Sequence, residues 1–227
     1  MRQEGDGMIR AGYHHGDLRR ALLESAMELA RGGGRDAVVL RDAARRAAVS
    51  PNAVYRHFAS RDDLLAAVAG QAQEAMAERM LGFESSTPTT GSVARDRLRA
   101  VGLGYIAFAL DEPGWFDAAF SDITAQPGTA APPPLALLVE ALDGLVAAGE
   151  LPPDARAGAE WPCWSTVHGF ALLALHGPLR AHPRSEVWAS AERAVDAVVD
   201  GVLLRRRPGD GGRGAARGGS DDPALPD

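Results

Sequence analysis

Residues 40–65 of the chain read LRDAARRAAVSPNAVYRHFASRDDLL. Residues 41–48 are all compatible with a helix, and alanines recur among them at a spacing that lets a neighbouring helix approach closely. Ser50 is a favoured N-cap and Pro51 is favoured at the first helical position, so we predict that a second, short helix begins there. The stretch therefore predicts two helices joined by a tight turn, followed by the start of a third.

The predicted second helix has an apolar side and a polar, basic side. Val54 and Phe58, four residues apart, would hold it on the core. The outward positions would then be Asn52, Ala53, Tyr55, Arg56 and His57. Two short helices with this turn and this outer face are typical of a helix-turn-helix, whose second helix fits the major groove of duplex DNA.

The residue types on that outer face match the chemistry of DNA. The amide of Asn52 can pair with adenine and the methyl group of Ala53 can contact a thymine methyl group. Tyr55, His57 and Arg61 are suited to phosphate contacts. The remaining residues of the predicted DNA-binding set are Arg41, Ser50, Pro51 and Arg56. The alternative is a small helical bundle with solvated arginines, which the coincidence of turn, cap, proline and basic-aromatic order disfavours.

Residues 55–64, YRHFASRDDL, resemble the signature that closes the DNA-binding domain of TetR-type (tetracycline-repressor-like) transcriptional regulators. Residues 13–18 and 43–50 are similar to the same family. The family usually has a larger aliphatic residue at Ala43, Gly at Ala48 and often Lys at Arg61, which affects local packing and turn geometry. The resemblance covers about the first third of the chain and implies a homodimer that binds a palindromic operator.

Composition limits the other classes of protein. Cys163 is the only cysteine, so an intrachain disulfide is impossible and a reducing cytoplasm is the natural setting. No apolar run approaches the length of a membrane span, and residues 1–12 lack the apolar region of a signal peptide. We therefore expect a cytoplasmic protein, associated with the nucleoid when it is bound to DNA.

The charge is unevenly distributed. The net charge is −6, and all 24 basic residues are arginine. Residues 1–61 hold eleven Arg and seven acidic residues, whereas residues 62–227 hold thirteen Arg and twenty-three acidic residues. A basic end on an acidic body can still bind DNA, because only the contacting face must neutralise phosphates.

The pattern along the chain predicts an all-α fold with two domains. We expect a three-helix helix-turn-helix domain, linked by a fourth helix to a C-terminal helical domain for ligand binding and dimerisation. Further helices are predicted over 17–30, up to about Leu81, 93–110, 115–120, 135–146, 155–178 and 185–206. The Gly32-Gly33-Gly34 triplet is expected to stop the first helix, and a Pro/Gly-rich loop is expected over 126–134. The predicted divisions are a flexible arm (1–12), the DNA-binding domain (13–80, its helix-turn-helix about 39–58), the effector domain (93–207) and a disordered tail (208–227).

The C-terminal half is rich in aromatic residues on apolar helix faces. The pattern Trp164-x-x-x-His168-Gly169 resembles the Trp-His-Gly (WHG) effector domain found behind some TetR-type DNA-binding domains. Candidate residues for an effector pocket are Tyr105, Trp115, Phe116, Phe120, Trp161, Trp164, His168 and Phe170. Few charges lie among them, which favours an apolar or weakly polar effector. Ordinary core packing is the competing explanation for each of these aromatic side chains.

The sequence thus predicts a DNA-binding transcriptional regulator, a repressor released from its operator by a small molecule. The apolar faces of the last two helices are the candidates for the dimer contact. The alternatives are an effector-independent regulator or an activator, and more distantly an enzyme. Ser165 and His168 are three residues apart near Cys163 and His176, but no nucleophile elbow accompanies them. No cofactor and no metal site are predicted, since neither a phosphate-binding loop nor a metal-ligand pattern is present.

Overall fold

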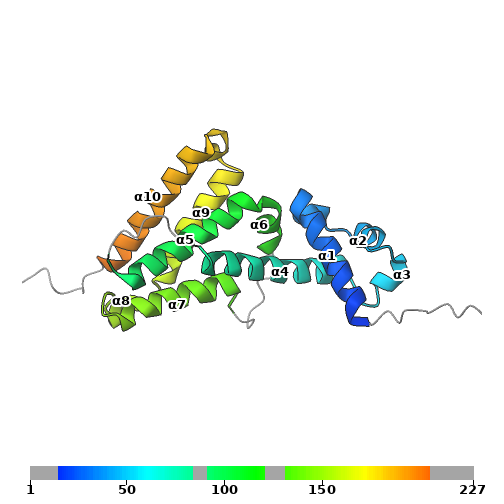
Figure 1. Cartoon of the computed structure of the whole chain (residues 1–227), viewed down its shortest axis with the longest axis horizontal. Helices are drawn as coiled ribbons and strands as arrows, with labels where there is room; N and C mark the ends of the chain where they lie inside the picture. Colours follow the sequence, from blue (N-terminus) through cyan, green and yellow to red (C-terminus); the bar gives the residue numbers. More distant parts are fainter. Residues whose placement is uncertain (1–14, 84–90, 121–130, 205–227) are drawn as a thin grey trace, which may run out of the picture.

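The computed structural model describes residues 15–83, 91–120 and 131–204. Within these ranges every regular element is a helix, which confirms the all-α prediction. The molecule is elongated, with α1–α3 at one end of its long axis and α9 and α10 towards the other (Figure 1). The expected arm at 1–12, most of the expected loop at 126–134, Arg205–Arg207 and the tail at 208–227 lie outside the described residues.

The N-terminal domain contains the expected helix-turn-helix. Its elements are α1 (His15–Gly33), η1 (Arg35–Ala37), α2 (Leu40–Arg46) and α3 (Pro51–Val54), and α4 (Arg61–Leu81) follows. The expectation that the glycine triplet stops α1 at its first member was wrong. Gly32 and Gly33 belong to α1, and the chain turns at Gly34, whose φ of 65° is a conformation that glycine adopts without strain.

Apolar side chains close the N-terminal domain around the short α3. Val54 and Phe58 are almost fully buried against Leu22 and Leu64, so the two predicted anchors are in the core. Burial of side chains of this size contributes roughly 1.5–3 kcal/mol each. A helix as brief as α3 is not stable alone, so its position depends on these contacts.

Helix α4 belongs to both domains. Ser60 caps its start, where the Oγ atom accepts a hydrogen bond from the amide of Asp63 at 3.1 Å. Leu64 and Val68 in its first half are buried in the N-terminal core, while Met76 and Met80 in its second half are buried against the C-terminal helices. The predicted end near Leu81 is confirmed, and α4 provides the link between the two domains.

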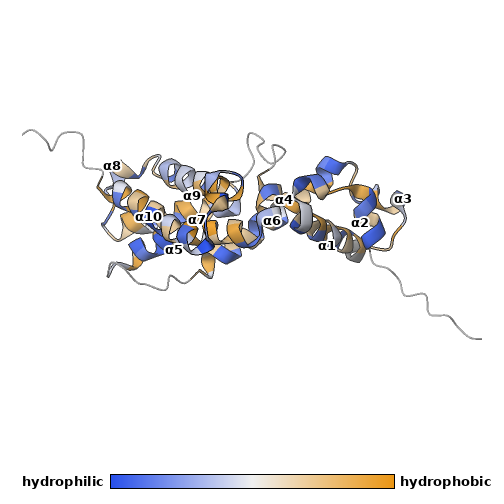
Figure 2. Cartoon of the chain, turned by 90° about the horizontal axis from the view of Figure 1, so that it is seen from above, coloured by the Kyte–Doolittle hydropathy of each residue, from blue (hydrophilic) through white to orange (hydrophobic). Residues whose placement is uncertain are grey.

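The C-terminal domain surrounds α5. Its elements are α5 (Val93–Asp111), α6 (Pro113–Ala119), α7 (Pro133–Ala147), α8 (Pro153–Arg156), α9 (Glu160–Leu175), η3 (Pro178–Ala181) and α10 (Arg184–Leu203). The single helix expected from 155 to 178 is wrong at its start, because the chain breaks at Gly158, whose φ is 73°. Figure 2 shows the apolar positions of this domain gathered among α5, α7, α9 and α10.

Among the described residues no helix combines the length and the apolar character that a membrane crossing requires. Figure 2 shows charged and polar positions on the outside of the same helices.

Candidate functional site

The turn between α2 and α3 is built by a strained residue and a capping residue. Ala48 has a φ of 54°, a left-handed conformation that is uncommon for a residue with a Cβ atom. Ser50 is the N-cap of α3, and its Oγ atom accepts a hydrogen bond from the amide of Ala53 at 3.3 Å. Pro51 is the first residue of α3, as predicted. The cap and the proline together fix where the recognition helix begins.

Most of the predicted DNA-contacting residues lie at the surface. Asn52, Arg56 and Arg41 are exposed, and the side chain of Tyr55 is 55% exposed. Ser50 is also exposed, while Ala53 and His57 are partly buried. The start of α3 therefore presents polar and aromatic groups outward, which groove binding requires.

The exposed face next to α3 is basic. Arg41, Arg45 and Arg46 on α2 are exposed, and only Arg45 is drawn into a local ion pair, with Asp42 at 2.9 Å. Exposed arginines beside a recognition helix supply the charge that holds phosphates.

Arg61 has a role inside the protein that sequence reasoning missed. Its Nε atom donates to the carbonyl oxygen of Val38 at 2.8 Å, and its Nη2 atom donates to that of Arg35 at 2.7 Å. The side chain is partly buried. Arg61 thus joins the first residue of α4 to the segment between α1 and α2, and its guanidinium is already engaged where a phosphate contact had been expected.

Five of the eight aromatic candidates for the effector pocket come together in one cluster between α5, α6 and α9. They are Tyr105, Phe116, Phe120, Trp164 and His168, whose ring centroids lie 5.2–6.3 Å from one another in nine pairs. Most of these contacts are edge-to-face or tilted, the arrangement that aromatic quadrupoles favour.

The cluster contains one hydrogen bond between side chains. The Tyr105 hydroxyl lies 2.8 Å from Nδ1 of His168. Tyr105 is only 1% exposed, and burial raises the pKa of its hydroxyl, which therefore stays protonated. Burial lowers the pKa of His168 below its ordinary value of 6.5, so its imidazole is neutral at pH 7.

Two hollows adjoin the aromatic cluster. The inner one has a volume of about 20 Å³, enough for roughly one water molecule, and Tyr105 and Trp164 contribute to its wall. The outer one has a volume of about 110 Å³. It is lined by Phe116, Asp117, Phe120, His168, Leu172 and His176.

The other three aromatic candidates lie elsewhere. The Trp115 indole donates from Nε1 to the carbonyl oxygen of Met27 at 2.8 Å and so faces α1. Trp161 is 58% exposed, and Phe170 is buried in the core without lining either hollow. Periodicity alone could not separate these three from the cluster, because it does not show which helix each face meets.

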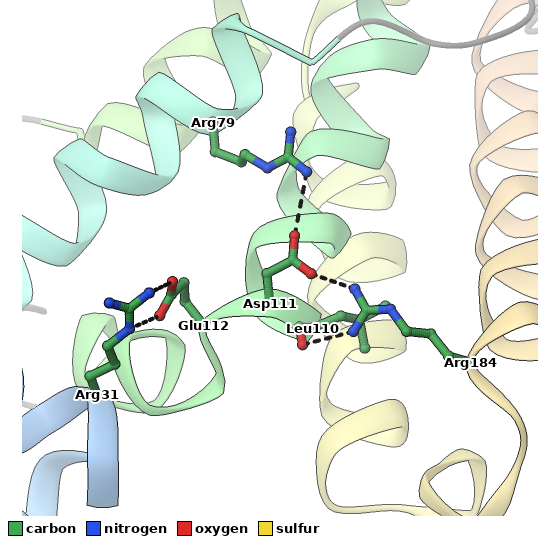
Figure 3. Close-up of polar contacts among 6 residues, drawn as sticks. All are labelled: Arg31, Arg79, Leu110, Asp111, Glu112 and Arg184. Carbon is green, nitrogen blue, oxygen red and sulfur yellow. Dashed lines mark hydrogen bonds and ion pairs between the residues drawn. The ribbon is translucent and has the colours of Figure 1, made fainter.

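Helix α6 contacts the DNA-binding domain directly. Glu112, which precedes α6, accepts hydrogen bonds from Arg31 of α1 (Figure 3). A Cβ atom on Gly114 would lie 2.2 Å from the carbonyl oxygen of Ala30, so only glycine permits this approach. Asp117 accepts a hydrogen bond at Oδ2 from the amide of Arg35 at 2.9 Å. No sequence signal had indicated these contacts.

The neighbouring carboxylate holds the other side of the same junction. Asp111, the last residue of α5, pairs with Arg79 of α4 at 3.4 Å and with Arg184 of α10. Arg184 also donates to the carbonyl oxygen of Leu110 at 3.1 Å (Figure 3). Two consecutive acidic residues therefore connect the end of α5 to α1, α4 and α10.

The residues considered for catalysis do not form a nucleophile and base. Ser165 is exposed, whereas Nδ1 of His168 is occupied by Tyr105. Cys163 is buried, and burial raises the pKa of its thiol to about 11, which suppresses the reactive thiolate. Among the described residues no cluster of potential metal ligands occurs.

An exposed, capped recognition helix on an all-α scaffold defines a DNA-binding transcriptional regulator. Residues 22–68 match the family described as bacterial regulatory proteins, tetR family, and residues 98–198 match the tetracyclin repressor-like C-terminal domain. The chain belongs to the TetR family of regulators. The Trp164–Gly169 pattern lies within the second matched region.

Solved structures show the same fold. A protein of unknown function from Rhodococcus sp. RHA1 is 29% identical, with a TM-score of 0.62 over 86% of this chain and 97% of its own. The TetR regulator SCO7222 from Streptomyces coelicolor is 20% identical, with a TM-score of 0.60 over 84% of this chain and 99% of its own. A TetR from Acinetobacter baumannii AYE in complex with minocycline is 21% identical, with a TM-score of 0.56 over 79% of this chain and 93% of its own. No protein with a curated description matches the sequence.

Proposed function

We propose that the protein is a homodimeric repressor that binds a palindromic operator and is released from it by a small apolar or weakly polar molecule. The observation that carries the proposal is the exposure of Asn52, Tyr55 and Arg56 at the start of α3, beside the exposed arginines of α2. Such a regulator acts in the cytoplasm, at the nucleoid when it is bound to DNA.

The assignment of base-reading and phosphate-binding residues is tested by selection from a library of randomised duplexes. We expect a palindrome with half-sites about one helical turn, roughly 34–36 Å, apart. Asn52→Ala should change the base preferred at one position of each half-site, at a cost of about 1–3 kcal/mol. A selected site identical to that of the unchanged protein would remove Asn52 from the base-reading set. Tyr55→Ala should instead weaken binding to all duplexes alike.

The proposed dimer contact involves the outward faces of α9 and α10. Trp161, Leu172 and Leu173 on α9 are exposed large apolar residues, and Leu204 follows α10. A Cβ atom added to Gly169 on α9 would meet open space. Exposed apolar side chains around a glycine suit the close approach of a second helix.

The dimer contact is tested by Leu173→Arg, with Leu81→Arg as its control. Both leucines are about half exposed, at 47% and 53%, but Leu81 ends α4 and lies off the α9–α10 face. We expect the first variant to sediment as a monomer and to lose operator binding, and the control to remain a dimer. Two dimeric variants would refute the contact.

The aromatic cluster and its two hollows support the effector part of the proposal. An apolar wall with few polar groups is the usual form of a small-molecule site. Family members described by structure include a TetR in complex with minocycline, a related example of effector binding in this fold.

One observation favours a second candidate, an effector-independent regulator. The inner hollow of about 20 Å³ holds no more than roughly one water molecule, so the interior of the domain has no ready space for a ligand. Operator affinity that did not change with any small molecule would support this candidate.

A further inference from the structure

The outer hollow brings together two polar groups with different partners. It lies between α6 and α9, where Asp117 and His168 stand among Phe116, Phe120 and Leu172, and His176 lies at its edge. His168 is also part of the aromatic cluster, whereas Asp117 is hydrogen-bonded to the DNA-binding domain. The pocket is therefore bounded by one group from each domain's network of contacts.

The Tyr105 hydrogen bond fixes the proton on His168. The buried Tyr105 hydroxyl has Nδ1 of His168 as its hydrogen-bond partner, so it must donate to that nitrogen. A neutral imidazole that accepts at Nδ1 carries its proton at Nε2. Tyr105 does not line the outer hollow, so the opposite edge of the His168 ring is the one that offers an N–H donor there.

Asp117 connects the wall of the pocket to the helix-turn-helix. Its Oδ2 atom accepts the amide proton of Arg35 in η1 at 2.9 Å, and a Cβ atom on Gly34 would lie 2.4 Å from that oxygen. On its other side, η1 offers the carbonyl oxygen of Arg35 to Arg61 at 2.7 Å. The same short turn is thus held by a pocket residue and by the first residue of α4.

We propose that the outer hollow binds an uncharged, largely apolar molecule with a carbonyl or hydroxyl oxygen, which accepts a hydrogen bond from His168, and that Asp117 transmits its binding to the DNA-binding domain. This inference rests on the proposed effector-controlled function. The Asp117 carboxylate in the wall disfavours an anionic ligand. A molecule that fills the pocket displaces Asp117 from the Arg35 amide, and the loss of that bond releases η1, to which Arg61 is bound.

The ligand chemistry is tested with three naphthalenes of one shape: 2-acetylnaphthalene, 2-isopropenylnaphthalene and 2-naphthoate. Calorimetry on the full chain should show the ketone binding roughly 2–10-fold more tightly than the alkene, the range expected for one net hydrogen bond. The carboxylate should bind weakest. Equal affinities for ketone and alkene, tightest binding by the carboxylate, or no binding by any of the three would overturn the assignment.

The proton on His168 is tested directly by ¹⁵N spectra of histidine-labelled protein. We expect His168 with an unprotonated Nδ1 and a protonated Nε2, and a change of the Nε2 signal on addition of 2-acetylnaphthalene. His176→Gln provides the control, because His176 lines the same pocket and its removal should leave the tautomer unchanged. A proton on Nδ1 would refute the donor assignment.

The transmission step is tested with Asp117→Ala, Asp117→Asn and the control Glu140→Ala, which removes an exposed carboxylate from α7. Operator affinity is measured with and without saturating 2-acetylnaphthalene. We expect a roughly 5-fold or larger loss of affinity in the unchanged protein and the control, the usual scale of allosteric coupling. Asp117→Ala should still bind the ketone but lose most of this effect, and Asp117→Asn, which keeps an acceptor oxygen, should retain it.

Two outcomes separate this inference from the proposed function. If Asp117→Ala keeps the full loss of operator affinity, transmission runs by another route and the inference fails while the regulator remains. If the unchanged protein selects no DNA sequence at all, the proposed function fails, whereas calorimetry still decides the ligand chemistry of the pocket.

Discussion

Replacement of Arg61 by Ala distinguishes a structural role of this residue from a phosphate contact. The guanidinium donates to the carbonyl oxygens of Val38 and Arg35 at 2.8 and 2.7 Å. Hydrogen bonds to a charged group contribute about 1.5–3 kcal/mol each, and partial exposure places these two at the lower end. We therefore expect a loss of about 2–3 kcal/mol, which lowers Tm by roughly 4–12 °C in a chain of this size.

The salt dependence of binding to a nonspecific duplex provides the second readout. Each phosphate contact contributes about 0.9 to the slope of log K against log salt. Because Arg61 is engaged with the protein, Arg61→Ala should leave that slope nearly unchanged. Arg56→Ala is the matched control: Arg56 is exposed on the outer face, so its loss should reduce the slope by about 0.9 and leave Tm unchanged. A reduced slope with an unchanged Tm in Arg61→Ala would refute the structural role.

Three further predictions concern single residues. Ala48→Gly should stabilise the protein by about 0.5–1 kcal/mol, seen as a higher midpoint of urea unfolding, because the φ of 54° costs alanine about 1–2 kcal/mol and glycine loses only part of this through its greater freedom when unfolded. The pKa of His168 is lowered by burial, so its contribution to stability is complete above its ordinary value of 6.5 and falls as pH drops below that value; His168→Asn, which keeps an acceptor for Tyr105, should lose less stability between pH 7.5 and 5 in thermal melts. The Cys163 thiol, with its pKa raised to about 11, should react with iodoacetamide far more slowly in the folded chain than in urea, and similar rates would contradict its burial.

The parts of the fold that depend on local chemistry were predictable from the sequence. Ser50 with Pro51 and Ser60 start α3 and α4 where the capping rules place them. The errors arose where backbone conformation decides the outcome. Gly33 continues α1 while Gly34 ends it, and Gly158 breaks a run that reads as one apolar helix. Glycine is compatible with both outcomes, and only the surrounding packing selects one.

The candidate sites were predictable to different extents. The exposed face of α3 follows from the positions of Val54 and Phe58, since two buried anchors define the opposite side of a short helix. The roles of Arg61, Trp115 and Asp117 depend on partners 20 or more residues away in the sequence, at Val38, Met27 and Arg35. Periodicity identifies a helix face but not the helix it meets, so these contacts were beyond sequence reasoning.

The close seat of α6 on α1 limits how freely the two domains can be recombined by engineering. A chimaera that replaces everything before α5 with the reading head of another repressor would keep Glu112, Gly114 and Asp117 but remove Arg31 and Arg35, to which two of them are bound. Such a hybrid would recognise its new operator yet respond poorly to the effector. Grafting only the segment from α2 to α3 leaves this joint intact and is the better route to a regulator with altered DNA preference.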